Sequence, residues 1–323
     1  MPTLHEALDS LHPIVDTTFA SSLIRDPGGV AQRYARAGAN YYPSDRIAAW
    51  SGQIVQDIVA GGPVTGYVVG DFGYGKTSAA LHLVRECDAA GIVVVPPVVY
   101  TSIDEMAACM HAFVRHAVGA HRPSLAIAVD EDFARVREAI DVQAFINFAR
   151  NCADRVLESG QKGLVFIIDE LQEYLNVGDS ARTRAQALSY MVKAVRELAP
   201  TIVGGRTTAR GLPFGVVMLM PASPTEGMLR EQADDMMQRM DEHGTSPRLD
   251  DAYGVQFVRG VWGRVCGALD DPGLGRRLVH DQTLVALGQL VARRDLSNGP
   301  RTMMQAFRRV IQNADAGGGI YTP

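Results

Sequence analysis

The chain has 323 residues, of which 47% are hydrophobic and 21% charged, and its formal net charge is −5. This length supports a large core in one or two domains, and no apolar run is long enough to span a bilayer. This mildly acidic net charge argues against a dedicated, strongly basic nucleic-acid binder. It is compatible with local basic patches.

The N-terminus and the cysteines predict the compartment. The first six residues lack the basic and apolar regions of a signal peptide. The cysteines are far apart and show no metal-ligand spacing, which favours buried free thiols in a reducing environment. We therefore expect a soluble cytoplasmic protein without membrane contact. The cysteines are Cys87, Cys109, Cys152 and Cys266.

The first predicted elements lead to a glycine-rich loop. Residues 1–43 are of mixed character and form an N-terminal extension. Ser44 is followed by apolar residues at helical spacing, which predicts a helix that ends at the Gly61-Gly62 pair. The first strand of a sheet comes next and ends at Val69.

Residues 70–77 match the phosphate-binding pattern G-x-x-x-x-G-K-[ST] at every fixed position. The glycines let backbone N–H groups surround an anion, and the N-terminus of the following helix adds its partial positive charge. Lys76 is expected to reach the β- and γ-phosphates of ATP, and the Thr77 hydroxyl to bind Mg²⁺. The residues expected to bind nucleotide are Gly70, Asp71, Phe72, Gly73, Tyr74, Gly75, Lys76, Thr77, Ser78 and Asp169.

Further strands and helices follow in alternation. Residues 92–95 predict a second strand, which the double proline at 96–97 interrupts or places near a sheet edge. Residues 102–159 predict two or more helices with a break near residues 121–123. Residues 163–168 are apolar enough for a strand buried on both faces.

Two acids stand at the end of that third strand, where ligands bind in open α/β sheets. Asp169 is expected to hold the Mg²⁺ shell through water, and Glu170 to polarise the attacking water. This pairing favours hydrolysis over transfer to a second substrate. The alternative role for both acids is to cap the next helix.

The remaining elements complete an α/β core followed by helices alone. A helix over residues 183–198 precedes a flexible, basic connection at 201–211, and residues 215–220 predict a fourth strand. Helices at 255–269, 281–293 and 301–314 follow. Alternating strands and helices around a phosphate loop predict a doubly wound parallel sheet of the P-loop NTPase type with a C-terminal all-helical lid.

This arrangement resembles that of AAA+ ATPases, in the branch that includes origin-recognition and STAND-type proteins. The resemblance covers about residues 40–315. It implies that Arg301, which follows Pro300 at a lid helix, is a sensor-2 arginine that touches the γ-phosphate; an ordinary helix residue is the alternative. It also implies that Tyr41, Tyr42 and the pair Asp45-Arg46 lie near the adenine, although simple packing accounts for each equally well.

The chain departs from the family pattern in several places. Lys76 and Asp169 are 93 positions apart (169 − 76), which implies a helical insertion at about residues 102–159. The resemblance places a polar sensor-1 residue after the fourth strand, and in this chain that residue is Ser223 or Thr225. Two arginines are candidates for a finger that acts on a neighbouring subunit, with a solvated surface charge as the alternative for each: Arg239 and Arg248.

Two segments bear on partners. Arg206 and Arg210 in the 201–211 connection are candidates for phosphate contacts with DNA, and a plain surface connection is the alternative. The loop at 70–77 and the segment 169–175 resemble the ATPases of BREX-type bacterial phage-resistance proteins. By this likeness, residues 316–323 are a flexible end or the start of a link to a further domain.

These features predict four regions and one main function. The regions are an N-terminal extension at 1–43, an ATPase core at 44–253, a lid at 254–315 and the end at 316–323. The expected activity is ATP hydrolysis coupled to remodelling of DNA or a protein partner, in a homo-oligomer or larger complex. The likeness to BREX-type ATPases implies a role in phage defence. The alternatives are a STAND-like switch with slow turnover and a small-molecule kinase.

Overall fold

The computed structural model describes residues 20–317, apart from residues 139, 177–180, 200, 204–205, 210, 223–224, 243–246, 250–253, 268–277 and 294–298. A four-stranded parallel sheet lies at its centre, in the order β1-β6-β3-β2. The strands are β1 (Val64–Val69), β2 (Val93–Val99), β3 (Leu164–Asp169) and β6 (Phe214–Met220). Because these four strands are parallel, their carboxyl ends lie at one edge of the sheet. Residues 70–75 follow β1 at this edge, and Asp169 and Glu170 stand there at the end of β3.

The sheet is buried on both faces. Every residue of β1, β3 and β6 is buried, as the near-continuous apolar runs predict for parallel strands between helical layers. One layer contains α3 (Pro27–Asn40), α4 (Asp45–Val59) and α5 (Lys76–Ala89). The other contains α9 (Leu171–Asn176), α10 (Ala181–Arg196) and α12 (Asp234–Glu242).

Strand β2 lies at an edge of the sheet and runs through the double proline. Its pairing with β3 shifts register between Val95 and Val98, the residues on either side of Pro96 and Pro97. Proline lacks the N–H that a ladder needs, so an edge position next to an irregularity is where a strand tolerates it. The edge placement is confirmed, and the strand continues to Val99 rather than ending before the prolines.

Sequence-encoded caps begin several helices. The Ser44 hydroxyl accepts from the N–H of Ile47 at 3.4 Å and begins α4 at the predicted place. Asp26 accepts from Gly29 N at 3.0 Å and begins α3, a helix within the segment that the sequence left as mixed. A short helix, α2 (Ala20–Leu23), precedes it.

Three helices stand where the sequence predicts helices broken near residues 121–123. They are α6 (Ile103–His121), α7 (Pro123–Val136) and α8 (Val142–Glu158), and they pack against one another. Pro123 begins α7, since its missing N–H costs nothing in a first helical turn. Helix α6 contacts β2 and α8 contacts β3, so this group covers one end of the sheet.

The connection before β6 contains a hairpin. Strands β4 (Thr201–Val203) and β5 (Arg206–Ala209) pair antiparallel. The sequence interpretation of residues 201–211 as a flexible connection was therefore wrong for these two strands. Their β-branched residues flank a Gly-Gly pair, which is a hairpin signal.

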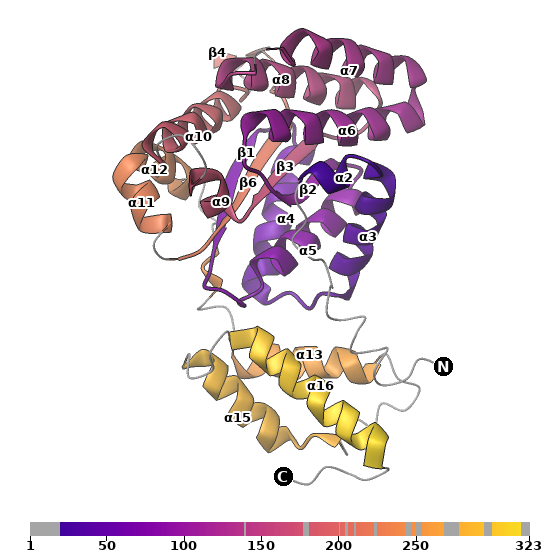
Figure 1. Ribbon diagram of the computed structural model, residues 1–323, viewed down its shortest axis with the longest axis vertical. Helices are drawn as coiled ribbons and strands as arrows, with labels where there is room; N and C mark the ends of the chain where they lie inside the picture. The colour runs from indigo at the N-terminus through magenta and orange to yellow at the C-terminus, as the bar shows by residue number, and fades with distance from the viewer. Residues whose placement is uncertain are drawn as a thin grey trace.

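Three helices follow the core. They are α13 (Val255–Gly267), α15 (Asp281–Ala292) and α16 (Gly299–Gly317), which the sequence predicts within two or three residues at each boundary. Trp262 of α13 and Phe307 of α16 hold them together, with ring centroids 5.0 Å apart. Figure 1 shows these helices beyond the carboxyl edge of the sheet. Among the described residues no helix has the length and apolarity needed to cross a bilayer.

Residues 247–249 lie along the outer side of β1. Val69 pairs with Arg248 in an isolated parallel bridge, and Val69 N donates to Pro247 O at 3.1 Å. Helix α11 (Thr225–Gln232) precedes α12 in the chain and completes the helices on this side of the sheet. Both flanks of β1 are therefore occupied where it enters the glycine-rich loop.

Candidate functional site

The loop between β1 and α5 has the backbone of an anion site. Gly73 and Gly75 have φ angles of 87° and 85°, which side-chain-bearing residues rarely adopt. Gly75 immediately precedes α5, and no side chain caps that helix. The N–H groups of its first turn are thus left for a ligand, and a phosphate is the group that this arrangement binds best.

Lys76 lies inside the loop that precedes it. Its side chain is buried, with 7% exposed. The ammonium group donates to Gly70 O at 2.9 Å and to Asp71 O at 3.4 Å. The charge is therefore held where the loop would surround a phosphate.

Thr77 and Asp169 bring the loop and β3 together. Thr77 Oγ1 donates to Asp169 Oδ2 at 2.8 Å, and Glu170 N donates to Asp169 Oδ1 at 2.8 Å. Asp169 is 1% exposed. Burial raises the pKa of its carboxyl to about 6, and the charge of Glu170 adds to the rise; the two hydrogen bonds and Lys76 oppose it. A cation bound beside Asp169 would therefore stabilise the ionised form of this buried carboxyl.

Glu170 has a strained backbone and a tethered side chain. Its φ of 46° lies in the left-handed region, the one such value among non-glycine residues that the structure describes. Its Oε2 accepts a hydrogen bond from Gln172 Nε2. Gln172 was not singled out from the sequence, and only its position two residues after Glu170 could have drawn attention to it.

The start of α16 contacts the loop. Arg301 N donates to Gly73 O at 3.3 Å, and the Arg301 guanidinium lies over the Phe72 ring, 4.5 Å from its centroid. A Cβ on Gly299 would lie 2.8 Å from the Tyr74 ring. Arg301 therefore reaches the predicted nucleotide loop, and its helix begins two residues earlier than expected; its contact with a γ-phosphate stays a prediction.

The segment before α4 contacts α13. A Cβ on Gly260 would lie 2.1 Å from the Tyr42 ring, and the ring centroids of Tyr42 and Phe257 are 6.0 Å apart. Arg264 donates a hydrogen bond to the Tyr41 carbonyl oxygen. Asp45 and Arg46 are exposed at the start of α4. The two tyrosines thus join the core to the helices that follow it, while the role of all four near adenine stays a prediction.

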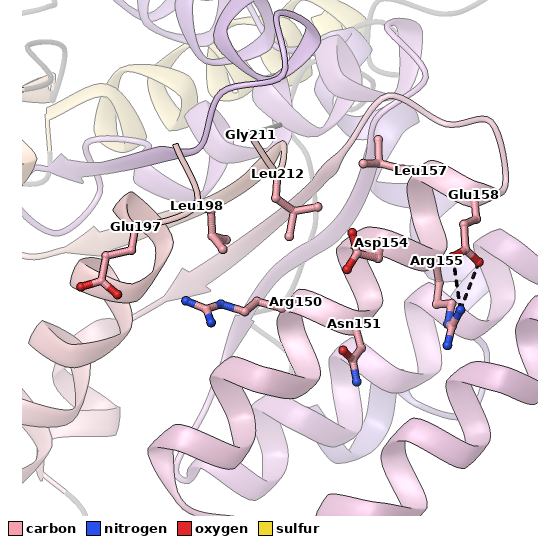
Figure 2. Close-up of a pocket in the computed structure, with 10 residues that line it drawn as sticks. All are labelled: Arg150, Asn151, Asp154, Arg155, Leu157, Glu158, Glu197, Leu198, Gly211 and Leu212. Carbon is pink, nitrogen blue, oxygen red and sulfur yellow. Dashed lines mark hydrogen bonds and ion pairs between the residues drawn. The ribbon is translucent and has the colours of Figure 1, made fainter. Parts of the chain in front are cut away.

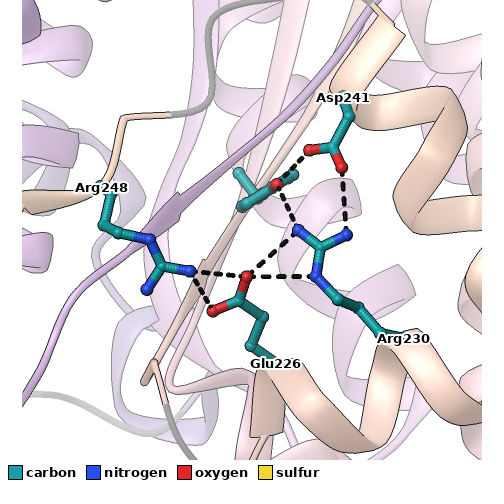
Figure 3. A network of polar contacts seen from close by, with 5 residues as sticks. Glu226, Arg230, Asp241 and Arg248 are labelled. Atoms are coloured by element: carbon teal, nitrogen blue, oxygen red, sulfur yellow. Dashed lines mark hydrogen bonds and ion pairs between the residues drawn. The ribbon is translucent and has the colours of Figure 1, made fainter.

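The two arginine-finger candidates differ in their surroundings. Arg248 Nη2 donates to Glu226 Oε1 at 2.8 Å, and Glu226 also accepts from Arg230 Nη2 at 3.1 Å (Figure 3). Arg239 lies 3.9 Å from the carboxylate of Asp235 on the same helix. Arg248 is therefore engaged by a buried acid of its own chain, and Arg239 carries the weaker surface pair.

The same network reaches β1. Tyr67, three residues before the loop, donates to Asp241. Arg230 donates to Asp241 Oδ2 at 3.1 Å (Figure 3). Burial raises the pKa of Tyr67 to about 12, with the hydrogen bond to Asp241 as the next cause. Glu226 and Arg230 form an i,i+4 pair on α11, whereas Asp241 lies on α12 and Tyr67 on β1, so no local motif predicts the whole network.

The other predicted site residues fall in several places. Ser223 and Arg210 lie outside the described residues. Thr225, the second sensor-1 candidate, is 3% exposed at the start of α11. Arg206 begins β5.

A separate cavity of about 700 Å³ lies at the amino edge of the sheet (Figure 2). Its described lining comes from the end of α8, the end of α10 and the residues just before β6. Arg150, Asn151 and Asp154 line it from α8, and none of the predicted nucleotide residues do so. It is therefore at the opposite end of the strands from the glycine-rich loop.

The described residues contain no group of three or more His, Cys, Asp or Glu side chains arranged to hold a metal ion. A cation at the loop would instead have one hydroxyl and one carboxylate from the protein. Such a sparse protein shell suits Mg²⁺, which keeps waters and takes phosphate oxygens.

The loop, the parallel sheet and the helices after it define an α/β P-loop fold with a helical C-terminal region, as predicted. The chain is similar in structure to the ORC2 protein of Aeropyrum pernix in its ADP form, with a TM-score of 0.52 and 16% identity. The match covers 84% of this chain and 63% of that one. This likeness supports the origin-recognition resemblance at the level of the fold. Neither a protein-family model nor a curated protein matches the chain, and the likeness to BREX-type ATPases stays an expectation from sequence.

Proposed function

We propose that the chain is an AAA+ ATPase module that binds ATP with Mg²⁺ at residues 70–77 and hydrolyses it. The observation that carries the proposal is the 2.8 Å contact between Thr77 Oγ1 and Asp169 Oδ2. It brings a hydroxyl and a buried carboxylate to the mouth of a loop whose backbone suits phosphate. This is the donor set of a P-loop NTPase metal site.

The residues present fit Mg²⁺. Hydroxyl and carboxylate oxygens are ligands that Mg²⁺ accepts, and a cation beside Asp169 offsets the burial that raises its pKa to about 6. Thr77 would bind the ion directly, and Asp169 would hold it through water. When bound, the ion neutralises charge on the β- and γ-phosphates.

The remaining roles follow from position. Lys76 would exchange its bonds to the Gly70 and Asp71 carbonyls for phosphate oxygens. Glu170, at the end of β3, would orient the attacking water. Arg301 would contact the γ-phosphate from the start of α16, because its backbone already lies on the loop at Gly73.

The finer proposal is that this module couples its nucleotide state to remodelling of DNA or a protein partner in an assembly. Support comes from the fold shared with the ORC2 structure and from the basic residues at 206 and 210. The likeness of segments 70–77 and 169–175 to BREX-type ATPases supports a role in bacterial phage defence.

Steady-state ATP hydrolysis, measured over a range of protein concentrations with and without duplex DNA, tests the proposal. Glu170→Gln is expected to retain ATP binding and lose turnover. Glu173→Gln, an exposed acid in the next helix turn, is the matched control and should leave turnover unchanged. Full turnover in Glu170→Gln rejects Glu170 as the base, and turnover that rises with concentration and DNA supports an assembling, DNA-linked ATPase.

A nucleotide switch with slow turnover is the second candidate. The contact that favours it is the hydrogen bond from Gln172 to Glu170, because a carboxylate held by a donor is less free to orient water. Bound nucleotide with negligible turnover at every concentration would favour this function.

A further inference from the structure

Two aromatic side chains occupy variable positions of the phosphate loop, and both contact the first turn of α16. We propose that Phe72 positions Arg301 and that Tyr74 seats Gly299, so that the loop itself reports ATP to the helices that follow the core. Phe72 is a positioning residue that holds Arg301 when no γ-phosphate is bound. The inference rests on the proposed function and adds to it a mechanism for sensing the γ-phosphate.

The Tyr74 contact sets where α16 begins. Tyr74 is 4% exposed, and its ring leaves no room for a Cβ on Gly299, which would approach to 2.8 Å. Gly299 has a φ of 41°, a value that also favours glycine. The first turn of α16 can therefore approach the loop as closely as a backbone allows.

The Phe72 contact holds the Arg301 side chain. The Phe72 ring is 62% exposed, which is unusual for a phenylalanine, and the guanidinium covers it at 4.5 Å from the centroid. Within the described part of the chain, Arg301 has no ion pair. Its charge therefore rests on a ring face rather than on a carboxylate, and an anion can take it without breaking a salt bridge.

ATP and ADP then act differently on this contact. A γ-phosphate attracts the guanidinium more strongly than a ring does, so ATP draws Arg301 away from Phe72, whereas ADP leaves it there. ATP binding thereby loses the cation–π contact and ADP binding does not. Removing the ring should tighten ATP binding by about two- to fivefold, the equivalent of an exposed cation–π contact, and leave ADP binding unchanged.

The first test needs no nucleotide. Hydrogen exchange of the first turn of α16, which contains the Arg301 N–H bonded to Gly73 O, is compared in wild type, Phe72→Leu and Phe72→Trp. We expect faster exchange in Phe72→Leu and near-wild-type exchange in Phe72→Trp, since tryptophan keeps the aromatic face. Tyr190→Leu, which removes another exposed ring, is the control. Equal exchange in Phe72→Leu and wild type overturns the proposal.

The second test measures the affinities of ADP and of a non-hydrolysable ATP analogue by calorimetry. Phe72→Leu should raise the ATP-to-ADP affinity ratio by about two- to fivefold, and Phe72→Trp should restore the wild-type ratio. In an Arg301→Gln background the same Phe72→Leu change should have no effect, which a merely structural role would not produce. An unchanged ratio in Phe72→Leu overturns the nucleotide part of the inference.

Failure of the proposed function is recognised separately. A wild-type chain that binds neither nucleotide rejects the ATPase proposal and, with it, the sensing of ATP. The exchange experiment still decides whether Phe72 positions the first turn of α16, because it uses the chain without ligand.

Discussion

Thr77 Oγ1 lies 2.8 Å from Asp169 Oδ2, although 92 positions separate the two residues in the chain. The contact links the first turn of α5 to the last residue of β3. It leaves Asp169 almost without solvent and with one hydroxyl donor and one backbone donor. The ionisation of this one carboxyl therefore controls both the stability of the region and its affinity for a cation.

Asp169 should lower stability at neutral pH. Its folded pKa of about 6 lies above the ordinary value of 3.8, so its contribution is fully present below pH 3.8 and is lost as the pH rises through 6. Asp169→Asn should be more stable than wild type by about 3 kcal/mol at pH 7.5 and about equal near pH 4. Denaturant unfolding at both pH values measures this. Asp88→Asn, at an exposed acid, is the control variant.

Binding of Mg²⁺ should depend on the same carboxyl. The ionised form is the ligand, so the affinity for Mg²⁺ in the presence of ATP should fall by about tenfold per pH unit below pH 6. Titration of Mg²⁺ between pH 5 and 8 tests this. A flat profile would show that Asp169 is not part of the metal site.

Lys76→Ala should abolish ATP binding while the chain stays folded. The ammonium group donates to two carbonyl oxygens of the loop, and these can turn to water. We expect a loss of at least about a hundredfold in affinity, the scale of a buried charge-assisted contact with phosphate. Binding of a fluorescent ATP analogue measures it, with exposed Lys162→Ala as the control. Retained binding would place the nucleotide elsewhere.

Gln172→Leu should raise basal hydrolysis. The substitution frees the Glu170 carboxylate from its donor, and one hydrogen bond of about 1 kcal/mol corresponds to about a fivefold change. Single-turnover hydrolysis gives the rate directly. Exposed Gln143→Leu on α8 serves as the reference variant. A slower rate in Gln172→Leu would mean that Gln172 aligns Glu170 for catalysis instead of restraining it.

Glu226→Gln should destabilise the outer flank of β1. Glu226 is 7% exposed and accepts from both Arg230 and Arg248. Losing its charge should cost about 2 kcal/mol of unfolding free energy, because two guanidinium groups exchange a charged acceptor for a neutral one. Thermal unfolding tests this against Glu231→Gln, an exposed acid on the same helix. Equal melting temperatures would show that the network adds nothing to stability.

Much of the fold and part of the candidate site could be predicted from the sequence. The glycine-rich loop, the apolar run before Asp169 and the prolines of β2 are local patterns with direct physical meaning. The hairpin at 201–209 was missed because the basic character of the segment favoured a plain connection, even though Gly204-Gly205 stands between its two short strands. Here a local turn signal was outweighed by composition.

The specific hydrogen bonds between distant segments could not be predicted from local patterns, although the family resemblance implied that Arg301 lies near the nucleotide. Arg301 reaches Gly73 across more than two hundred positions, and Arg248 reaches Glu226 from the far side of α12. The spacing of apolar residues along the sequence does not indicate such pairs, since they depend on how the helices are placed around the sheet. The tether from Gln172 to Glu170 is close in sequence, yet it requires the positive φ at Glu170 that no pattern announces.

The prolines of β2 have a consequence for the protein in a crowded solution. An outermost strand offers a row of unpaired donors and acceptors to any other extended chain, and this is how sheets of separate molecules fuse into aggregates. Pro96 and Pro97 lack N–H groups, and because the N–H groups of adjacent strand residues point to opposite edges, one of the missing donors belongs to the outer edge of β2. A second extended chain therefore finds an interrupted template at this border.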